Sequence, residues 1–220
     1  MMVKKRGERL SQGEAYQRIL EAAEPLFAER NPELVSFRDL ASAAGVSLSA
    51  INYHFGTRQA LFRQIFLRRA RIQTERRLAY LEQLKREGRE KDIEAIIEAF
   101  IRPVFNVQPG DKNDLFNKMR ARLVADASPD SHATLREAYD DNDRLFIEAL
   151  AGALPHLSLK DIYWRFHFLV GSMIYTMSDF GQLEESSGGI CSPVNSEESI
   201  HYMIHTFSAA LRAPSTSIAE

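Results

Sequence analysis

Small polar and aromatic side chains gather in residues 47–58, and their chemistry suits the edges of DNA bases. Serine and asparagine side chains hydrogen-bond to bases or phosphates, and asparagine pairs particularly well with adenine. An apolar side chain such as that of Leu48 can contact the methyl group of thymine. His54 either contacts a phosphate or packs beside Phe55. The residues of this stretch that we expect to contact DNA are Ser47, Leu48, Ser49, Asn52, Tyr53, His54 and Arg58.

Further residues that we expect to contact DNA lie outside this stretch, and they are basic residues or helix caps. Lys4, Lys5 and Arg6 form a basic N-terminal arm that can reach the DNA backbone or the minor groove. Ser36 precedes a short predicted helix, as Ser47 does, so both are expected to cap helices, with a phosphate contact as a second use. Arg58 begins the next helix, where free backbone amides and the helix dipole also attract phosphate.

Short helices with clear start and stop signals position these residues. The periodicity predicts an amphipathic helix over residues 12–30, stopped by Asn31-Pro32. Ser36 to Asp39 is typical of a helix N-terminus, and Gly45 is a natural residue just past a helix end. A second short helix then runs from Leu48 to about Phe55. Two short helices around a glycine turn, behind a longer supporting helix, indicate a helix-turn-helix over about residues 36–55.

Three segments of the sequence resemble the DNA-binding domain of the TetR family of bacterial regulators. They read Phe37-Arg38-Asp39-Leu40-Ala41, Ala44-Gly45-Val46-Ser47 and Ile51-Asn52-Tyr53-His54-Phe55-Gly56-Thr57-Arg58-Gln59-Ala60-Leu61-Phe62. The resemblance covers about residues 14–65 with unbroken spacing. Many members have two tyrosines where this chain has Asn52-Tyr53, and many have lysine at Arg58, so the bases that are read can differ.

The resemblance implies a homodimer that binds a palindromic DNA operator. It also implies a C-terminal ligand-binding core, whose last two long helices pair between protomers. Most members of the family repress transcription and release DNA when a small molecule binds.

The rest of the chain is also predicted to be helical, which gives an all-α fold of about nine helices and no sheet. The sequence predicts a DNA-binding domain over residues 1–57 and a ligand-binding and dimerisation domain over 58–220. The helices expected in the second domain span residues 58–87, 91–107, 112–127, 132–153, 158–182 and 196–212. Helices 158–182 and 196–212 carry the apolar and aromatic surfaces that suit a dimer interface.

Charge is distributed unevenly along the chain. Residues 1–56 hold seven basic and seven acidic side chains, residues 57–89 hold ten and three, and residues 90–220 hold eleven and twenty. This asymmetry suggests a polyanion-facing end and a separate acidic body. Cys191 is the single cysteine, which is typical of a reducing cytoplasm. The sequence predicts no membrane-spanning segment, because no apolar run approaches 18 residues.

A ligand cavity between the helices of the body is the default site for a small molecule. Aromatic and methionine side chains at helical spacing usually form plain core, but together they suit an apolar, flexible ligand. Arg120 or Arg122 is expected to pair with an acidic head group. The segment Asn52 to Gly56 is similar to that of regulators that sense fatty acids or acyl-CoA. The expected ligand-binding residues are Phe100, Val104, Phe105, Phe116, Met119, Arg120, Phe146, Met173 and Met177.

Other chemistry finds little support in the sequence. His201 and His205 have the spacing of a helical metal pair without an evident third ligand, and Cys191 has no basic neighbours to lower its pKa. The arginine-rich run from Arg68 to Arg77 is interpreted as a solvated helix face. We find no nucleophile elbow, phosphate loop or metalloprotease motif, so we expect neither an enzyme, nor a cofactor, nor a metal.

Three hypotheses follow from these observations. The first is a ligand-responsive repressor of palindromic operators. The second is a constitutive dimeric DNA-binding protein without a ligand. The third is a ligand-binding protein whose DNA-binding domain has degenerated, against which the intact Asn52-Tyr53 pair and Arg58 argue.

Overall fold

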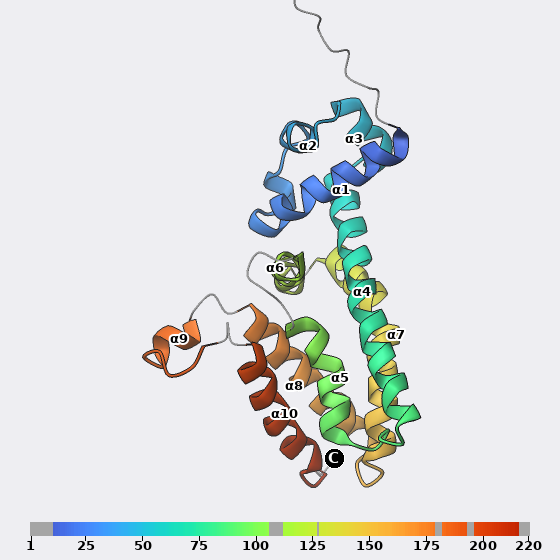
Figure 1. The fold of residues 1–220 in the computed structure, drawn as a ribbon, viewed down its shortest axis with the longest axis vertical. Coiled ribbons are helices and arrows are strands. Elements are labelled where there is room, and N and C mark those ends of the chain that lie inside the picture. Colours follow the sequence, from blue (N-terminus) through green and yellow to red (C-terminus); the bar gives the residue numbers. More distant parts are fainter. Residues whose placement is uncertain (1–10, 106–111, 127, 179–181, 193–195, 216–220) are drawn as a thin grey trace, which may run out of the picture. The chain divides into compact units, whose positions relative to one another are not determined.

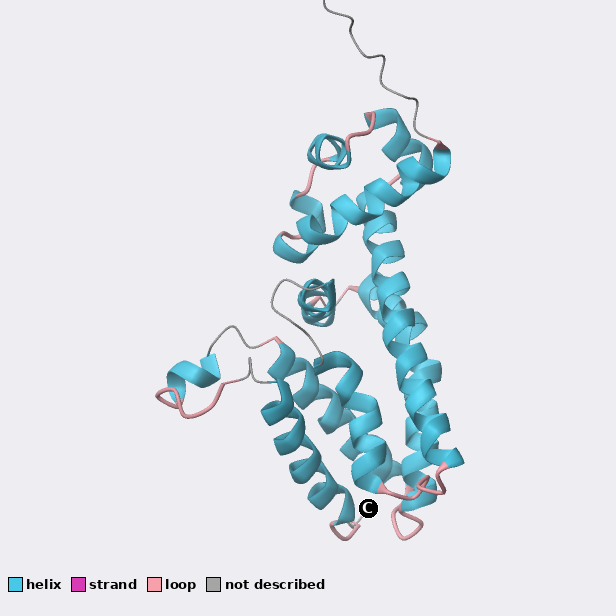
Figure 2. Ribbon diagram, viewed as in Figure 1, coloured by secondary structure: helices cyan, strands magenta, loops and turns pink. Residues whose placement is uncertain are grey.

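The computed structural model describes residues 11–105, 112–126, 128–178, 182–192 and 196–215. Within these ranges the chain forms ten α-helices and one short 3-10 helix and has no strand, which confirms the all-α prediction (Figures 1 and 2). The helix beyond the expected nine is α9, Gln182–Ser186. Five residues are too few to produce a recognisable helical periodicity in the sequence.

Contacts divide the chain into two compact units, residues 1–66 and residues 67–220. The division falls inside α4, Arg58–Arg86, a single helix that begins in the first unit and continues into the second. The predicted boundary at residues 57 and 58 followed the start of this helix. Contacts place the division later because Leu61, Ile65 and Phe66 are buried in the first unit.

The first unit holds α1 (Gln12–Glu29), the 3-10 helix η1 (Pro32–Leu34), α2 (Phe37–Ala44) and α3 (Leu48–Phe55). The predicted caps are present. The side chains of Ser36 and Ser47 accept hydrogen bonds from the backbone amides of Asp39 and Ala50. Gly45 ends α2 with φ of 64°, in the left-handed region that side chains other than glycine rarely adopt. These local signals fix the turn between α2 and α3.

Apolar side chains from α1, α2, α3 and the start of α4 form the core of the first unit. Phe27 of α1 contacts Phe62 of α4 edge-on, with ring centroids 5.7 Å apart, and Phe62 stacks near Phe66. Leu40 of α2 and Ile51 of α3 are completely buried. The short helices α2 and α3, which cannot be stable alone, are thus held by packing against α1 and the start of α4.

The second unit contains the remainder of α4 and six further helices. Five of the six were predicted, and their bounds agree with the predicted ranges to within a few residues, except that α8 ends about five residues early. These helices are α5 (Ile93–Phe105), α6 (Lys112–Ala125), α7 (Pro129–Ala153), α8 (Leu159–Met177), α9 and α10 (Ser196–Arg212). α5 packs against α7, α8 and α10, while α6 packs against α7 and α8. Most side chains of α5 are buried, and α8 contacts α5, α6, α7 and α10.

None of the helices that the structure describes is long and apolar enough to cross a membrane.

Candidate functional site

The helix α3 has two chemically distinct sides. Ile51 and Phe55 face inward with exposed fractions of 0 % and 6 %. Asn52 is exposed, and Leu48 and Tyr53 are exposed by 42 % and 72 %. The buried side chains hold α3 in place, while a large aromatic side chain and an asparagine are exposed next to each other. Such an exposed surface on a fixed helix is suited to contact with a partner. The structure therefore brings these three predicted DNA-contacting residues onto one accessible surface.

Ser47 and Ser49 lie at the N-terminus of α3 and are both exposed. Their hydroxyl groups are 2.9 Å apart and share a hydrogen bond, while the Ser47 hydroxyl also accepts from the Ala50 amide. The N-terminus of a helix-turn-helix recognition helix is the end that meets base edges. Both hydroxyls lie at that end, and a DNA contact from either one stays a prediction.

His54 is half-buried and packs among aromatic rings. Its ring centroid lies 5.7 Å from that of Tyr16 and 5.1 Å from that of Tyr53. Tyr16 in turn stacks on Phe55 at 5.2 Å and donates a hydrogen bond to Gln64. His54 thus links the exposed side of α3 to α1, and its predicted contact with a phosphate is not tested by this arrangement.

Arg58 has protein partners that the sequence did not suggest. Its Nη1 donates hydrogen bonds to the backbone oxygens of Glu33, at 2.8 Å, and Val35, at 3.3 Å. These bonds tie the start of α4 to the segment before α2. The geometry assigns Arg58 a structural role, and its phosphate contact stays a prediction.

Ser36 and Asp39 form a reciprocal cap at the start of α2. The Ser36 side chain accepts from the Asp39 amide, and the Asp39 carboxylate accepts from both the amide and the hydroxyl of Ser36. These hydrogen bonds from Ser36 lower the pKa of Asp39. The capping role predicted for Ser36 is confirmed. Lys4, Lys5 and Arg6 lie outside the described residues.

In the second unit, most of the predicted ligand-binding side chains are packed core. Phe100, Met119 and Met173 have exposed fractions of 1 % or less, and Met177 is half-buried. The others are also buried: Val104, Phe105, Phe116, Arg120 and Phe146. Phe100 contacts Phe146 and Phe166, with ring centroids 5.0 Å and 4.9 Å away. Five of the nine share one hydrophobic core cluster and Met177 packs against it, whereas Phe116, Met119 and Arg120 lie outside that cluster. Their contact with a ligand stays a prediction.

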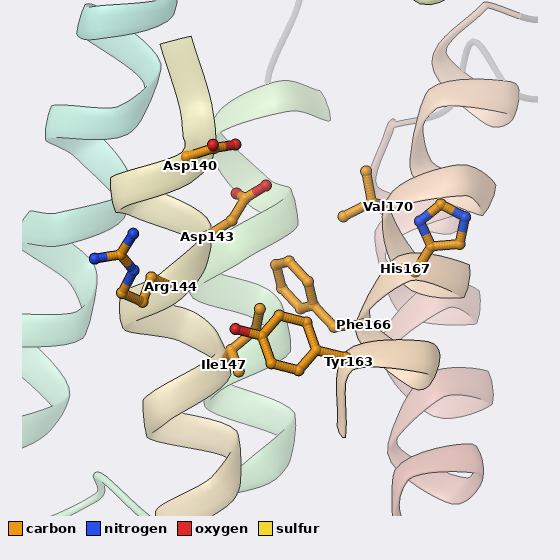
Figure 3. Close-up of a pocket in the computed structure, with 8 residues that line it drawn as sticks. All are labelled: Asp140, Asp143, Arg144, Ile147, Tyr163, Phe166, His167 and Val170. Carbon is orange, nitrogen blue, oxygen red and sulfur yellow. The ribbon is translucent and has the colours of Figure 1, made fainter. Parts of the chain in front are cut away.

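An open groove of about 370 Å³ lies between α7 and α8 (Figure 3). Asp140 and Asp143 extend into it from α7, and Phe166 and the hydroxyl end of Tyr163 extend into it from α8. None of the nine predicted ligand-binding residues lines this groove. Its lining residues are Asp140, Asp143, Arg144, Ile147, Tyr163, Phe166, His167 and Val170.

The interpretation of the arginine run as a solvated face is wrong for its last member. Arg77 is completely buried in the second unit, where its Nε donates to the Phe100 backbone oxygen at 2.8 Å. The spacing of its neighbours on α4 carries the signal: Ala70, Gln73, Leu81 and Leu84 are also buried, at intervals of three and four residues. Arg77 therefore occupies a core position of an amphipathic helix despite its charge.

The described residues contain no group of three or more histidine, cysteine or acidic side chains that could hold a metal ion. His201 and His205 are both exposed on α10. Cys191 is half-buried, and its amide donates to the Ser187 hydroxyl.

The structure resembles solved regulators over most of its length. A TetR-family transcriptional regulator from Thermus thermophilus, PfmR, matches with 20 % identity and a TM-score of 0.62, over 92 % of this chain and 98 % of that one. The fatty acid degradation regulator FadR from Bacillus halodurans matches with 13 % identity and a TM-score of 0.64, over 86 % and 97 %. At such low identities these matches establish a shared fold. No curated protein matches the sequence.

Two family models match the chain, one to each of its units. The model described as bacterial regulatory proteins of the tetR family matches residues 19–65, which include α2 and α3. The model described as the tetracyclin repressor-like C-terminal domain matches residues 98–210, about half of the chain. The helix-turn-helix geometry, the helical second unit and these two matches agree, and the chain belongs to the TetR family of bacterial regulatory proteins.

Proposed function

We propose that the protein is a sequence-specific, dimeric repressor that binds a palindromic operator through α3 and is released by an apolar or amphipathic ligand. The exposed side of α3 carries this proposal. Asn52 and Tyr53 stand in solvent on a helix whose position is fixed by the buried side chains of Ile51 and Phe55. Such a surface can enter a major groove without rearrangement of its support.

This function needs a dimer, because two recognition helices must reach successive major grooves about 34–36 Å apart, and we propose that α8 and α10 form its interface. α8 and α10 pack against each other, and both carry aromatic side chains in solvent. The exposed fractions are 51 % for Tyr163, 55 % for Trp164, 56 % for Phe168, 68 % for Tyr175 and 63 % for Tyr202. A protein that remains monomeric rarely leaves so many large aromatic side chains uncovered in one region.

Release by a ligand follows from the continuity of α4. This helix starts at Arg58, beside the DNA-binding helices, and extends into the second unit to Arg86. A ligand that displaces α4 by a few ångströms changes the separation of the two recognition helices, so one half-site is lost. A fatty acid or an acyl-CoA is our candidate for this ligand, because the core of the second unit is apolar and includes adaptable side chains such as Met173 and Met203 beside Phe100 and Phe146.

The first experiment measures binding to the DNA upstream of the protein's own gene by fluorescence anisotropy, across a salt series and beside a scrambled duplex. We expect a preference well over tenfold for the native duplex, at two protomers or a multiple of two per site. The variants Asn52→Ala and Tyr53→Ala are expected to lose this preference. Tyr80→Ala, which removes a partly exposed tyrosine on α4, is the control. Equal and steeply salt-dependent binding to both duplexes would show phosphate contacts only and would count against an operator at this location.

The dimer is tested separately by analytical ultracentrifugation of Trp164→Glu. A charge at this position in an apolar interface is expected to give monomers and to weaken operator binding. A Trp164→Glu protein that stays dimeric would place the interface elsewhere.

Ligand release carries a reciprocity that a constitutive DNA-binding protein lacks. A ligand that lowers operator affinity must itself bind less tightly when the operator is present, by the same factor. Calorimetric titration of decanoate into the free protein and into the protein–operator complex measures this factor. Equal affinities would favour the constitutive alternative.

A further inference from the structure

Buried polar side chains meet in the interior of the second unit, where aromatic core would be expected. We call this cluster the polar centre. Its linked members are the buried Arg77 from α4, Arg120 from α6, and Tyr139 and Asn142 from α7, with the half-buried Asp143 of α7. We include the buried Gln73 and Asn117, which lie about one turn before Arg77 on α4 and before Arg120 on α6. Arg77 is 0 % exposed, Gln73 is 1 % exposed and Arg120 is 2 % exposed. Burial of two arginines in one place needs a specific reason, because a buried charge without a counter-charge is costly.

Arg77 is held by neutral groups. Its guanidinium donates to the Phe100 backbone oxygen, to Asn142 Oδ1 at 3.4 Å and to the sulfur of Met173 at 3.6 Å. The guanidinium carbon also lies 3.8 Å from the centre of the Phe100 ring. These contacts fix the side chain without cancelling its charge. Burial, together with the neighbouring Arg120, lowers the pKa of Arg77 to about 9, which leaves the side chain charged at neutral pH.

Arg120 lies over the Tyr139 ring, with its guanidinium carbon 4.2 Å from the ring centre. Among the described residues, neither its Nε nor its Nη1 has a hydrogen-bond acceptor, although both atoms are buried. The Nε2 and Oε1 atoms of Gln73 are likewise buried and have no hydrogen-bond partner among the described residues. The same is true of Asn117 Oδ1. Each such atom has lost its hydrogen bonds to water without a replacement, which destabilises the folded state. Buried polar groups are normally paired, so the polar centre lacks a binding partner.

The charges at the polar centre do not balance. Within the described residues, the charged groups that act on Arg77 there are Arg120 and Asp143. Asp143 is a weak counter-charge because burial raises its pKa, and its Oδ1 accepts no hydrogen bond from any described residue. Two buried guanidinium groups therefore face a single half-buried carboxylate, because Asp140, which also acts on Asp143, is exposed to solvent. One further negative charge, carried by an acceptor that fits between the helices, would make the polar centre neutral.

We propose that the polar centre binds the carboxylate head group of the effector, with the apolar part of the ligand among the neighbouring aromatic and methionine side chains. Arg120 supplies the free donors, Gln73 a further amide donor, and Arg77 the second positive charge. Phe100, Phe146 and Met173 surround Arg77 and offer the apolar environment. This inference rests on the proposed function in so far as the bound acid is the molecule that releases DNA.

The position of the polar centre explains how a head group can act on α4. Gln73 and Arg77 lie one turn apart on α4, whereas Arg120 and Asn117 lie on α6. The unpaired polar atoms have almost no access to solvent, so we expect an acid to enter only when α4 and α6 separate. A carboxylate between them then holds α4 in the displaced position.

The groove between α7 and α8 is a poor site for an acid. Asp140 and Asp143 both extend into it, while the side chain of Arg144 points away from it (Figure 3). A carboxylate there would meet two like charges. The groove suits a cation instead, and the experiment below separates the two sites by the sign of the ligand charge.

Isothermal titration calorimetry of the purified protein with three ten-carbon probes tests the proposal. Sodium decanoate, decanol and decylammonium chloride share a tail and differ in head-group charge, and all are used below their micellar concentrations. We expect decanoate to bind at one molecule per protomer and about tenfold or more tighter than decanol. Equal binding of decanoate and decanol, tighter binding of decylammonium, or no binding of decanoate would each overturn the proposal.

Two variants with opposite expected effects locate the head group. Arg120→Gln removes a positive charge and is expected to weaken decanoate binding about tenfold or more. Asp143→Asn removes the competing negative charge and is expected to tighten decanoate binding several-fold. Neither variant should change the affinity for decanol. Arg136→Gln, an exposed arginine of α7, controls for the change in net charge. Circular dichroism and melting curves confirm that each variant is folded.

An unchanged affinity for decanoate in Arg120→Gln, or the same weakening in Arg136→Gln, would overturn the assignment to the polar centre. Ordered water would fill the polar centre equally well if no acid bound there, and then neither variant would alter the calorimetric response to decanoate. Operator binding is measured without any acid present. Failure of the acid site and failure of the proposed function are therefore seen in different experiments.

Discussion

The exposed side of α3 and the polar centre of the second unit use polar side chains in opposite ways. On α3, Asn52 and Tyr53 stand in solvent while the apolar back of the helix is buried. In the polar centre, Arg120 and Gln73 are buried, and several of their polar atoms have no partner among the described residues. On our proposal, α3 presents a preformed surface to DNA, whereas the polar centre gains its missing hydrogen-bond partners only when an acid binds.

This difference follows from the partners. DNA is large and rigid, so a protein gains most by presenting a preformed surface to it. A small ligand must be enclosed before its charge is worth much, because water screens an exposed pair. A surface of the first kind changes little on binding, while an interior of the second kind must open. If the polar centre opens to admit an acid, as we propose, it is the site able to transmit a signal.

The largest effect is expected where the support of the DNA-binding surface is removed. Ile51→Ala deletes a completely buried side chain behind α3 and is expected to cost about 2–5 kcal/mol of unfolding free energy. Leu48→Ala changes a neighbouring side chain that is 42 % exposed and is expected to change stability by about 0.5 kcal/mol or less. Denaturant unfolding followed by circular dichroism measures both values.

Operator affinity sharpens this test. At a temperature where both variants remain folded, Leu48→Ala is expected to weaken operator binding more than Ile51→Ala does, because only Leu48 faces outward. Equal losses of stability in the two variants would contradict the division of α3 into a supporting and a contacting side.

The sequence predicted the first unit well because its signals are local. Ser36, Gly45 and Ser47 each specify a cap or a turn through their own backbone geometry, and the structure confirms all three. The polar centre depends instead on side chains far apart in the chain, from Gln73 to Asp143, and no local rule connects them. Arg120 was predicted as a ligand contact, but Arg77 was assigned to solvent because its charge was given more weight than its position between Gln73 and Leu81.

A smaller effect is expected at Arg58, a residue that either supports the fold or contacts DNA. Arg58→Met removes the two hydrogen bonds to the backbone oxygens of Glu33 and Val35 and is expected to cost about 1–3 kcal/mol. If Arg58 only supports the fold, the dependence of operator binding on salt will keep its slope. A phosphate contact would lower that slope by about one. Arg38→Met, an exposed arginine of α2, is the control for stability.

If Arg58→Met leaves the unfolding free energy unchanged and lowers the salt dependence of operator binding, Arg58 contacts DNA and does not support the fold. The hydrogen bonds to Glu33 and Val35 would then be incidental to the fold.

The smallest effects concern pH, and the two regions are expected to respond with opposite signs. Hydrogen bonds from Ser36 lower the pKa of Asp39 below its usual 3.8. The charged form therefore stabilises the fold above that pH, and this stabilisation is lost as the pH falls through the lowered value. Burial raises the pKa of Asp143, so its ionisation costs stability as the pH rises from 3.8 through the raised value.

Melting temperatures of Asp39→Asn and Asp143→Asn, measured from pH 7 to pH 2.5, separate these signs. At pH 7 we expect Asp39→Asn to melt slightly below the unmodified protein and Asp143→Asn to melt above it, with both differences shrinking in acid. A loss of stability in Asp143→Asn at pH 7 would mean that this carboxylate is a required counter-charge of Arg77 and Arg120. The polar centre would then be balanced by the protein alone, and the argument that it needs a negative charge from a ligand would fail.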